Sequence, residues 1–252
     1  YQPCCERARF VLVASQFVRD DVVNAFRIDP NRVAVVPPGA PTALRTVSAA
    51  YDAVPPGPFA LYPAQAWAHK NHVRLLDAVA LLRDRGITVP VVCPGQPNLR
   101  LREVRRHAAN VGVDHLVTFP GYVPDAQLAG LYERARCLVF PSLFEGFGFP
   151  VLEAFVAGLP VACASATSLP ELAGPAAVQF DATDVESIAS AVREVWEDDR
   201  RRSELAALGR DRAAHYSWDH LALSCRALYR AAGDLPLGVQ DRSLLAEAGV
   251  PA

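Results

Sequence analysis

Short apolar runs alternate with amphipathic stretches along most of the chain. Beyond residue 58 the apolar runs occupy 59–64, 89–95, 115–123, 137–144, 159–165 and 176–180. They do not alternate strictly between apolar and polar positions, which is typical of strands buried on both faces of a parallel sheet. The stretches between them predict helices, at 69–86, 98–110, 125–136, 184–198 and 200–215. The pattern therefore predicts an α/β fold with a doubly wound, Rossmann-like parallel sheet.

The first of these helices is expected to bury one apolar face and to end at Gly86. Its expected buried positions are Val73, Leu76, Ala80 and Leu81. Ligands of doubly wound sheets bind beyond the carboxyl ends of the strands. The loops to inspect are therefore 64–70, 94–98, 120–125, 141–150 and 165–170.

Residues 1–42 predict a separate βαβ unit, with apolar runs at 9–15 and 31–41 around a helix at 16–28. The stretch 43–58 ends in "AVPPGP" and is interpreted as a linker. The main domain is expected over 59–232 and ends in a helix at 217–232. The tail, 233–252, has weak periodicity and is assigned no element.

Composition limits the classes of function. The chain has 252 residues, of which 51% are hydrophobic and 21% charged, and its formal net charge is -2. This balance is globular and argues against a nucleic-acid-binding protein. The apolar runs are shorter than the roughly 20 residues of a membrane-spanning helix. We expect a cytoplasmic location, with peripheral attachment to the inner face of the membrane as an alternative. The chain starts with Tyr1 and contains no methionine, so we expect that an N-terminal part is missing.

Metal and disulfide chemistry is not expected. The six cysteines form no C-x-x-C pair. Cys93, Cys137 and Cys163 fall in strand-like runs, and small buried residues in a reducing compartment are the preferred interpretation, with the adjacent Cys4 and Cys5 left uninterpreted. No D-x-D triplet is present to hold a divalent ion, and the histidines are not spaced as a ligand cluster. We therefore predict no metal and no cofactor.

Two glutamates stand in the apolar stretch "FPSLFEGFGFPVLEAFVAGLP" at 140–160. Glu145 is expected at the tip of a strand, followed by a glycine-rich loop, and Pro150 suits the first turn of a helix. Glu153 is then expected in that first turn. Amide groups at a helix N-terminus bind anions such as phosphate, and carboxylates bind sugar hydroxyls. A nucleotide sugar offers both groups. The alternative is a solvated Glu145 and a Glu153 that only stabilises the helix N-terminus.

Lys70, in "AHKNH", is the only lysine of the chain, against 24 arginines. It lies at another strand-to-helix junction on the same edge of the predicted sheet. A compact ammonium there suits a diphosphate. The alternative is an ordinary solvated lysine at the start of a helix.

These segments together resemble a known family. "FPSLFEGFGFPVLEAFVAGLPV", "HKNH" and "LVTFPGYV" are similar to the C-terminal, donor-binding half of retaining GT-B glycosyltransferases of group 1, also called family 4. The resemblance covers about residues 10–232. It implies that 1–42 is the end of an acceptor-binding domain and that 217–232 is a helix crossing back toward that domain.

The resemblance implies a role for each matching residue. Glu153 binds the ribose hydroxyls of the donor, Glu145 contacts the transferred sugar, and Lys70 binds the diphosphate and stabilises the leaving nucleoside diphosphate. The other implied donor contacts are the loop residues Gly146, Phe147, Gly148, Phe149 and Pro150, together with Gln65. Gly121, Tyr122 and Val123 are expected near the base.

The family usually carries an arginine five or six residues before the lysine, where this chain has Gln65 and Ala64. Gln65 donates hydrogen bonds but carries no charge, so diphosphate binding is expected to be weaker or to use another arginine. The loop with Trp67 and His69 resembles that of bacterial mannosyltransferase-like members, which points to GDP-mannose as a donor.

The implied reaction transfers a sugar from a nucleotide-diphosphate sugar to a glycan, lipid-linked or small-molecule acceptor, with retention and without a metal. The acceptor side is expected in the missing domain, so the fragment alone is expected to be inactive. The alternatives are a nucleotide-sugar epimerase or phosphorylase of the same fold, and a non-catalytic nucleotide-sugar-binding module. A dehydrogenase is disfavoured because no G-x-G-x-x-G follows the first strand.

Overall fold

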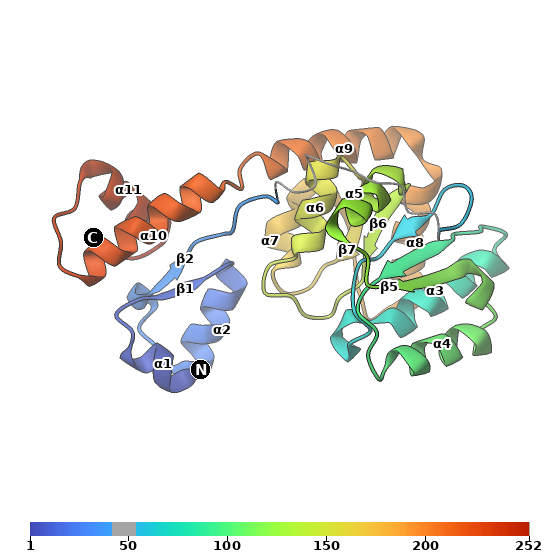
Figure 1. Ribbon diagram of the computed structural model, residues 1–252, viewed down its shortest axis with the longest axis horizontal. Helices are drawn as coiled ribbons and strands as arrows, with labels where there is room; N and C mark the ends of the chain where they lie inside the picture. Colours follow the sequence, from blue (N-terminus) through green and yellow to red (C-terminus); the bar gives the residue numbers. More distant parts are fainter. Residues whose placement is uncertain (42–53, 252) are drawn as a thin grey trace. The chain divides into compact units, whose positions relative to one another are not determined.

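The computed structural model describes residues 1–41 and 54–251, which fold as two compact units (Figure 1). The large unit is Pro41–Ala213, and the small unit joins Tyr1–Ala40 to Ala214–Ala252. Most of the linker expected at 43–58 lies outside the described residues, and 54–58 form no helix or strand.

The large unit contains a six-stranded parallel sheet in the order β5-β4-β3-β6-β7-β8. Its strands are β3 (Ala60–Leu61), β4 (Val91–Pro94), β5 (Val117–Gly121), β6 (Cys137–Phe140), β7 (Val161–Ala164) and β8 (Ala177–Phe180). Every residue of β3, β4, β6 and β7 is buried, as expected for continuous apolar runs covered on both sides. The predicted doubly wound α/β fold is therefore confirmed. The strand order reverses between β3 and β6, where ligands of such sheets bind.

Two groups of helices flank this sheet (Figure 1). In one group α3 (His72–Asp84) packs on α4 (Leu101–Asn110) and on α8 (Val185–Glu197). In the other, α6 (Phe149–Ala157) packs on α5 (Asp125–Arg134), α7 (Leu169–Ala173) and α9 (Asp199–Ala213). Short 3₁₀ turns lie at η3 (Ala68–Lys70), η4 (Asp114–Leu116) and η5 (Gly174–Ala176).

The buried face of α3 differs from the expected one. Of the four expected positions only Leu76 is buried, and Val73 is 37% exposed. The helix begins at His72, and this histidine is itself buried. Because a histidine is not counted as an apolar position, the buried stripe was assigned the wrong phase. The residues that α3 buries are His72, Leu75, Leu76, Ala78, Val79 and Leu82.

The small unit has a parallel pair of strands, β1 (Val11–Val13) and β2 (Val33–Val35). The helices α1 (Gln2–Arg7) and α2 (Gln16–Phe26) and the turn η1 (Pro30–Arg32) come from its first segment, and α10 (Trp218–Ala232) and α11 (Val239–Glu247) from its second. Ala34 and Val36 form one apolar cluster with residues of α10 and α11.

The tail that was assigned no element is helical over α11 and packs in that cluster through Leu244 and Leu245. Its weak periodicity has a physical cause. Asp241 lies on the buried side of the helix, where it pairs with Arg226 and Arg230 of α10. Within residues 1–41 and 54–251, no helix has the length and hydropathy needed to cross a bilayer.

Candidate functional site

The only lysine of the sequence lies where the strand order of the large unit reverses. Lys70 ends the turn η3, which follows β3 and leads into α3. Its ammonium lies 5.4 Å from the centre of the Phe140 ring at the end of β6. The next loop after β6 carries Glu145. Lys70 and Glu145, 75 residues apart in sequence, therefore lie in the segments that follow β3 and β6, the two strands that border the reversal point.

The two side chains form an ion pair. Lys70 Nζ lies 2.5 Å from Glu145 Oε1, and the side chains are only 18% and 13% exposed. The backbone at Glu145 is held as well, because its N–H donates to Thr167 Oγ1 at 3.0 Å and its carbonyl accepts from Ser168 Oγ at 2.9 Å. A largely buried charge costs free energy unless it is paired. The arrangement thus presents a positioned cation and a positioned carboxylate at the carboxyl edge of the sheet.

The glycine-rich loop after Glu145 leads into α6 in a way that requires Gly148. This residue caps α6 with φ of 109°, in the left-handed region that favours glycine. A Cβ there would lie 2.7 Å from Leu169 Cδ2. Among the described residues, the N–H groups of Gly148 and Phe149 make no hydrogen bond. Two donors at the positive end of α6 are therefore available to an anion.

Glu153 is the fifth residue of α6, so it lies beyond the first turn in which it was expected. The helix begins at Phe149, and Pro150 is its second residue. The Glu153 carboxylate accepts a hydrogen bond from the hydroxyl of Tyr132, with 2.6 Å between Oη and Oε2. Burial raises the pKa of Glu153, the nearby charge of Asp125 adds to the rise, and the hydrogen bond from Tyr132 opposes it. One hydrogen bond leaves the carboxylate with further acceptor capacity.

Glu153 lines a cavity of about 310 Å³ between the ends of several strands. The cavity brings five of the predicted residues together: Gln65, Tyr122, Val123, Pro150 and Glu153. Its remaining lining residues are Pro63, Ala64, Pro94, Gly95, Gln96, Asp125 and Leu128. Gly121, which precedes Tyr122 and has φ of 82°, accepts a hydrogen bond from the N–H of Gly95 at 2.9 Å.

The other predicted residues lie outside the lining of this cavity. Lys70 and Glu145 form their own ion pair, and Phe147 is buried with its ring edge-on to Phe149, 5.2 Å between the ring centres. Gly146 connects Glu145 to Phe147. The cavity and the ion pair are nonetheless joined by two short segments, 65–70 and 145–153.

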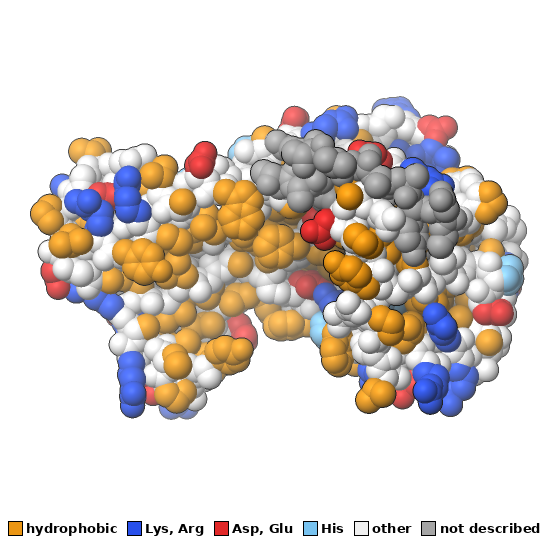
Figure 2. Space-filling view, in the orientation of Figure 1, with side chains coloured by type: hydrophobic (Ala, Val, Ile, Leu, Met, Phe, Trp, Pro, Cys, Tyr) orange, Lys and Arg blue, Asp and Glu red, His pale blue; other side chains and the backbone are white. Residues whose placement is uncertain are grey.

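Aromatic side chains are exposed on these same loops. Tyr122 is 61% exposed beside the cavity, and Trp67 is also exposed. The indole N–H of Trp67 donates to Gln65 Oε1 at 2.9 Å. Within the described part of the chain, the amide nitrogen of Gln65 makes no hydrogen bond, so a donor remains there. In Figure 2 the hydrophobic side chains on the viewed face of the large unit form separate groups, with charged side chains between them.

Several residues of the site were not identified from sequence. Tyr132 gives no signal, because its partner Glu153 is 21 residues away and its helix shows an ordinary apolar face. Thr167 and Ser168 lie in a loop that the strand-end rule selected, but nothing marked them individually. Asn71 stands beside Lys70 in "HKNH", but the sequence does not show that its side chain is buried.

No group of three or more His, Cys, Asp or Glu side chains among residues 1–41 and 54–251 is arranged to hold a metal ion. The expectation of a metal-independent site stays a prediction. All six cysteines are free thiols, and Cys93, Cys137 and Cys163 are buried.

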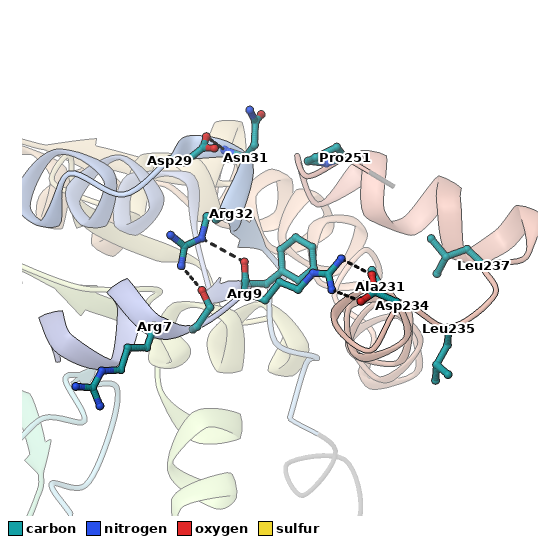
Figure 3. A pocket seen from close by; sticks show the side chains of 12 residues that line it. Arg7, Arg9, Asp29, Asn31, Arg32, Ala231, Asp234, Leu235, Leu237 and Pro251 are labelled. Carbon is teal, nitrogen blue, oxygen red and sulfur yellow. Dashed lines mark hydrogen bonds and ion pairs between the residues drawn. The ribbon is translucent and has the colours of Figure 1, made fainter.

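A larger cavity, of about 680 Å³, lies within the small unit (Figure 3). Most of its charged side chains serve contacts inside that unit. Arg9 pairs with both carboxylate oxygens of Asp234, at 2.8 and 2.7 Å, and Arg32 donates to backbone carbonyls at the end of α1, including that of Ala8. None of the site residues predicted from the sequence lines this cavity.

Comparisons with known proteins agree with the fold and with the family that the sequence resembles. The family described as "Glycosyl transferases group 1" matches residues 48–212, more than half of the chain. O-antigen chain mannosyltransferase B of Escherichia coli is 31% identical over 228 residues, which cover 85% of this chain and 58% of that protein. MMP alpha-(1->4)-mannosyltransferase of Mycolicibacterium hassiacum is 28% identical over 237 residues, covering 88% of this chain and 54% of the relative. The chain thus spans little more than half the length of these curated relatives.

Solved structures share the fold at low sequence identity. A glycosyltransferase from Rickettsia africae superposes with a TM-score of 0.79 and 16% identity, over 89% of this chain and 63% of that one. Anabaena HepE, solved in complex with UDP and glucose, has a TM-score of 0.77 and 17% identity, over 92% of this chain and 65% of its own. These likenesses confirm the architecture that the sequence predicted.

Proposed function

The chain belongs to the group 1 glycosyl transferases, and from that premise we propose that it supplies the donor-binding half of a retaining enzyme. The reaction transfers a sugar from a nucleoside-diphosphate sugar to a glycan or glycoconjugate acceptor. The observation that carries this proposal is the Lys70–Glu145 pair at the point where the strand order reverses, next to a cavity lined by Glu153.

The diphosphate is assigned to the region between Lys70 and the start of α6. A mostly buried ammonium and the N–H groups of Gly148 and Phe149 are the donors that phosphate oxygens require. As the bond to the sugar breaks, negative charge grows on the leaving nucleoside diphosphate. A positioned cation stabilises that charge more than it stabilises the bound donor, so Lys70 acts mainly on the rate.

The nucleoside is assigned to the cavity of about 310 Å³. The carboxylate of Glu153 accepts hydrogen bonds from the ribose hydroxyls, and Tyr132 fixes that carboxylate with its own hydroxyl at 2.6 Å. Tyr122 offers an exposed aromatic face to the base, and Val123 and Gly121 offer backbone groups beside it. The size of the cavity lies at the lower end of small-molecule pockets, which suits a nucleoside rather than a whole nucleotide sugar.

The transferred sugar is assigned to Glu145, whose carboxylate accepts hydrogen bonds from sugar hydroxyls. Mannose is the sugar we propose, and GDP-mannose the donor, because the two curated relatives described above are named mannosyltransferases. The nucleotide-diphosphate donor, the retention of configuration and the independence from metals belong to this proposal.

Calorimetric titration of the full-length protein with GDP and with UDP tests the proposal. We expect micromolar binding of at least one nucleotide, and Lys70→Ala to slow release of nucleoside diphosphate from the matching donor, GDP-mannose or UDP-glucose, more than it weakens binding. Arg102→Ala, an exposed basic residue of α4, is the matched control. Failure of both nucleotides to bind below millimolar concentration would refute the proposal, and binding without turnover by any donor would favour a non-catalytic module.

A further inference from the structure

The turn that carries Lys70 is held by hydrogen bonds from residues distant in sequence. The hydroxyl of Tyr62, just after β3, donates to the backbone carbonyl of Lys70 itself. From the other side of the reversal point, the N–H of Leu143 donates to the carbonyl of His69 at 2.7 Å. Two consecutive carbonyls of the turn are therefore fixed by the segments that follow β3 and β6.

Asn71 supplies the remaining contacts. Its side-chain nitrogen donates to the carbonyl of Pro141, just after β6, at 3.1 Å and to the carbonyl of Ala182, after β8, at 2.7 Å. Its side-chain oxygen accepts from Arg74 at 3.1 Å. Both N–H bonds of the amide and its oxygen are thus used, and the residue is 5% exposed. One side chain ties the Lys70 turn to two other strand ends.

The backbone of Asn71 restricts which residues fit. Its φ and ψ are 60° and 32°, in the left-handed region that glycine, asparagine and aspartate occupy more readily than other residues. Glycine fits this backbone but has no donor. Aspartate fits it too, but its carboxylate oxygen would face two carbonyl oxygens. Of these three residue types, asparagine alone satisfies both the backbone and the contacts.

We propose that Asn71 is a positioning residue for Lys70, an inference that rests on the function proposed above for Lys70. Pro141 lies four residues before Glu145, so the amide of Asn71 fixes the lysine turn directly to the segment that carries the partner carboxylate. Asn71 contacts no reacting group. It sets where the ammonium stands relative to the helix α6 and hence relative to a diphosphate.

The test uses Asn71→Gly in the full-length protein, because this variant keeps the backbone conformation and removes only the side-chain hydrogen bonds. We expect turnover, measured as release of nucleoside diphosphate from GDP-mannose or UDP-glucose, to fall about 10- to 100-fold, as for a misplaced catalytic group. Binding of GDP or UDP is expected to weaken less. Asn71→Asp is the second variant and is expected to lose at least as much turnover. Asn110→Gly, at an exposed asparagine that ends α4, is the control, and circular dichroism establishes that each variant is folded at the assay temperature.

A double-mutant cycle separates positioning from a general effect on structure. If Asn71 acts through Lys70, Asn71→Gly changes turnover in the wild-type background and has little further effect when Lys70 is already alanine. Equal losses of turnover in both backgrounds, or a turnover of Asn71→Gly equal to that of the wild type, would overturn the positioning role of Asn71 without affecting the function proposed for Lys70. If Lys70→Ala by itself leaves binding and turnover unchanged, the proposed function of Lys70 fails first, so the two failures are distinguishable.

Discussion

Glu145 is expected to compete with the donor for Lys70. In the structure the ammonium contacts the carboxylate at 2.5 Å, so a diphosphate that binds Lys70 has to displace or share that contact. We therefore expect Glu145→Gln to strengthen the binding of free GDP or UDP. The same substitution is expected to slow sugar transfer, because it removes a charged acceptor for the sugar hydroxyls.

The size of both effects follows from the hydrogen bonds involved. A hydrogen bond to a charged group contributes about 1.5–3 kcal/mol net, and a neutral one about 1 kcal/mol. Replacing the carboxylate with an amide thus removes about 1 kcal/mol of competition, which corresponds to about fivefold tighter nucleotide binding. The weaker contact to the sugar lowers turnover by about fivefold on the same scale.

Calorimetry with GDP and UDP gives the affinity, and release of nucleoside diphosphate from the donor gives the turnover. Glu133→Gln is the control, since Glu133 is an exposed glutamate of α5 in the same unit. Nucleotide binding that is weaker in Glu145→Gln than in the wild type would show that the carboxylate helps Lys70 to bind the nucleotide, and the competition argument would be wrong.

Three further substitutions test other parts of the large unit. Glu153→Gln should raise the free energy of unfolding at pH 7 in urea titrations, because burial raises the pKa of this carboxyl and its ionised form costs stability above that pKa. It should also weaken nucleotide binding, and a loss of stability without any change in binding would contradict its role. Burial lowers the pKa of His72 from 6.5 to about 4. The free energy of unfolding should therefore fall by about 3 kcal/mol as pH falls from 7 to 4, because the unfolded chain takes up the proton at a higher pH than the folded chain. His72→Gln should reduce this pH dependence of stability, whereas His115→Gln, at an exposed histidine, should not. Equal pH dependence in the two variants would refute the assignment to His72. Gly148→Ala should cost about 2–3 kcal/mol in thermal unfolding, from left-handed strain and the contact of its Cβ with Leu169, and an unchanged melting temperature would exclude that strain.

The sequence was sufficient for the architecture of the large unit because its strands are uninterrupted apolar runs. It was insufficient where a polar residue is buried. The stripe of α3 includes His72, and α11 turns Asp241 inward to pair with two arginines. In both helices a polar side chain occupies a core position, and this breaks the periodicity on which the prediction depends.

The candidate site likewise contains residues that stand out in the sequence and residues that do not. Glu145, Glu153 and Lys70 were selected as candidates because a charged residue in an apolar or lysine-poor context is conspicuous in a sequence. Tyr132 and Asn71 were not, because their importance lies in partners 21 or more residues away. The position of Glu153 past the first turn of α6 depends on where the loop ends, and helix ends are poorly defined by sequence alone.

The most direct measurement is a crystal structure of the full-length protein with bound GDP or UDP, whichever calorimetry selects. The diphosphate is predicted to lie within hydrogen-bonding distance of Lys70 Nζ and of the first amides of α6, with the ribose hydroxyls on the Glu153 carboxylate. A nucleotide bound elsewhere, or one whose diphosphate points away from Lys70, would contradict the assignment.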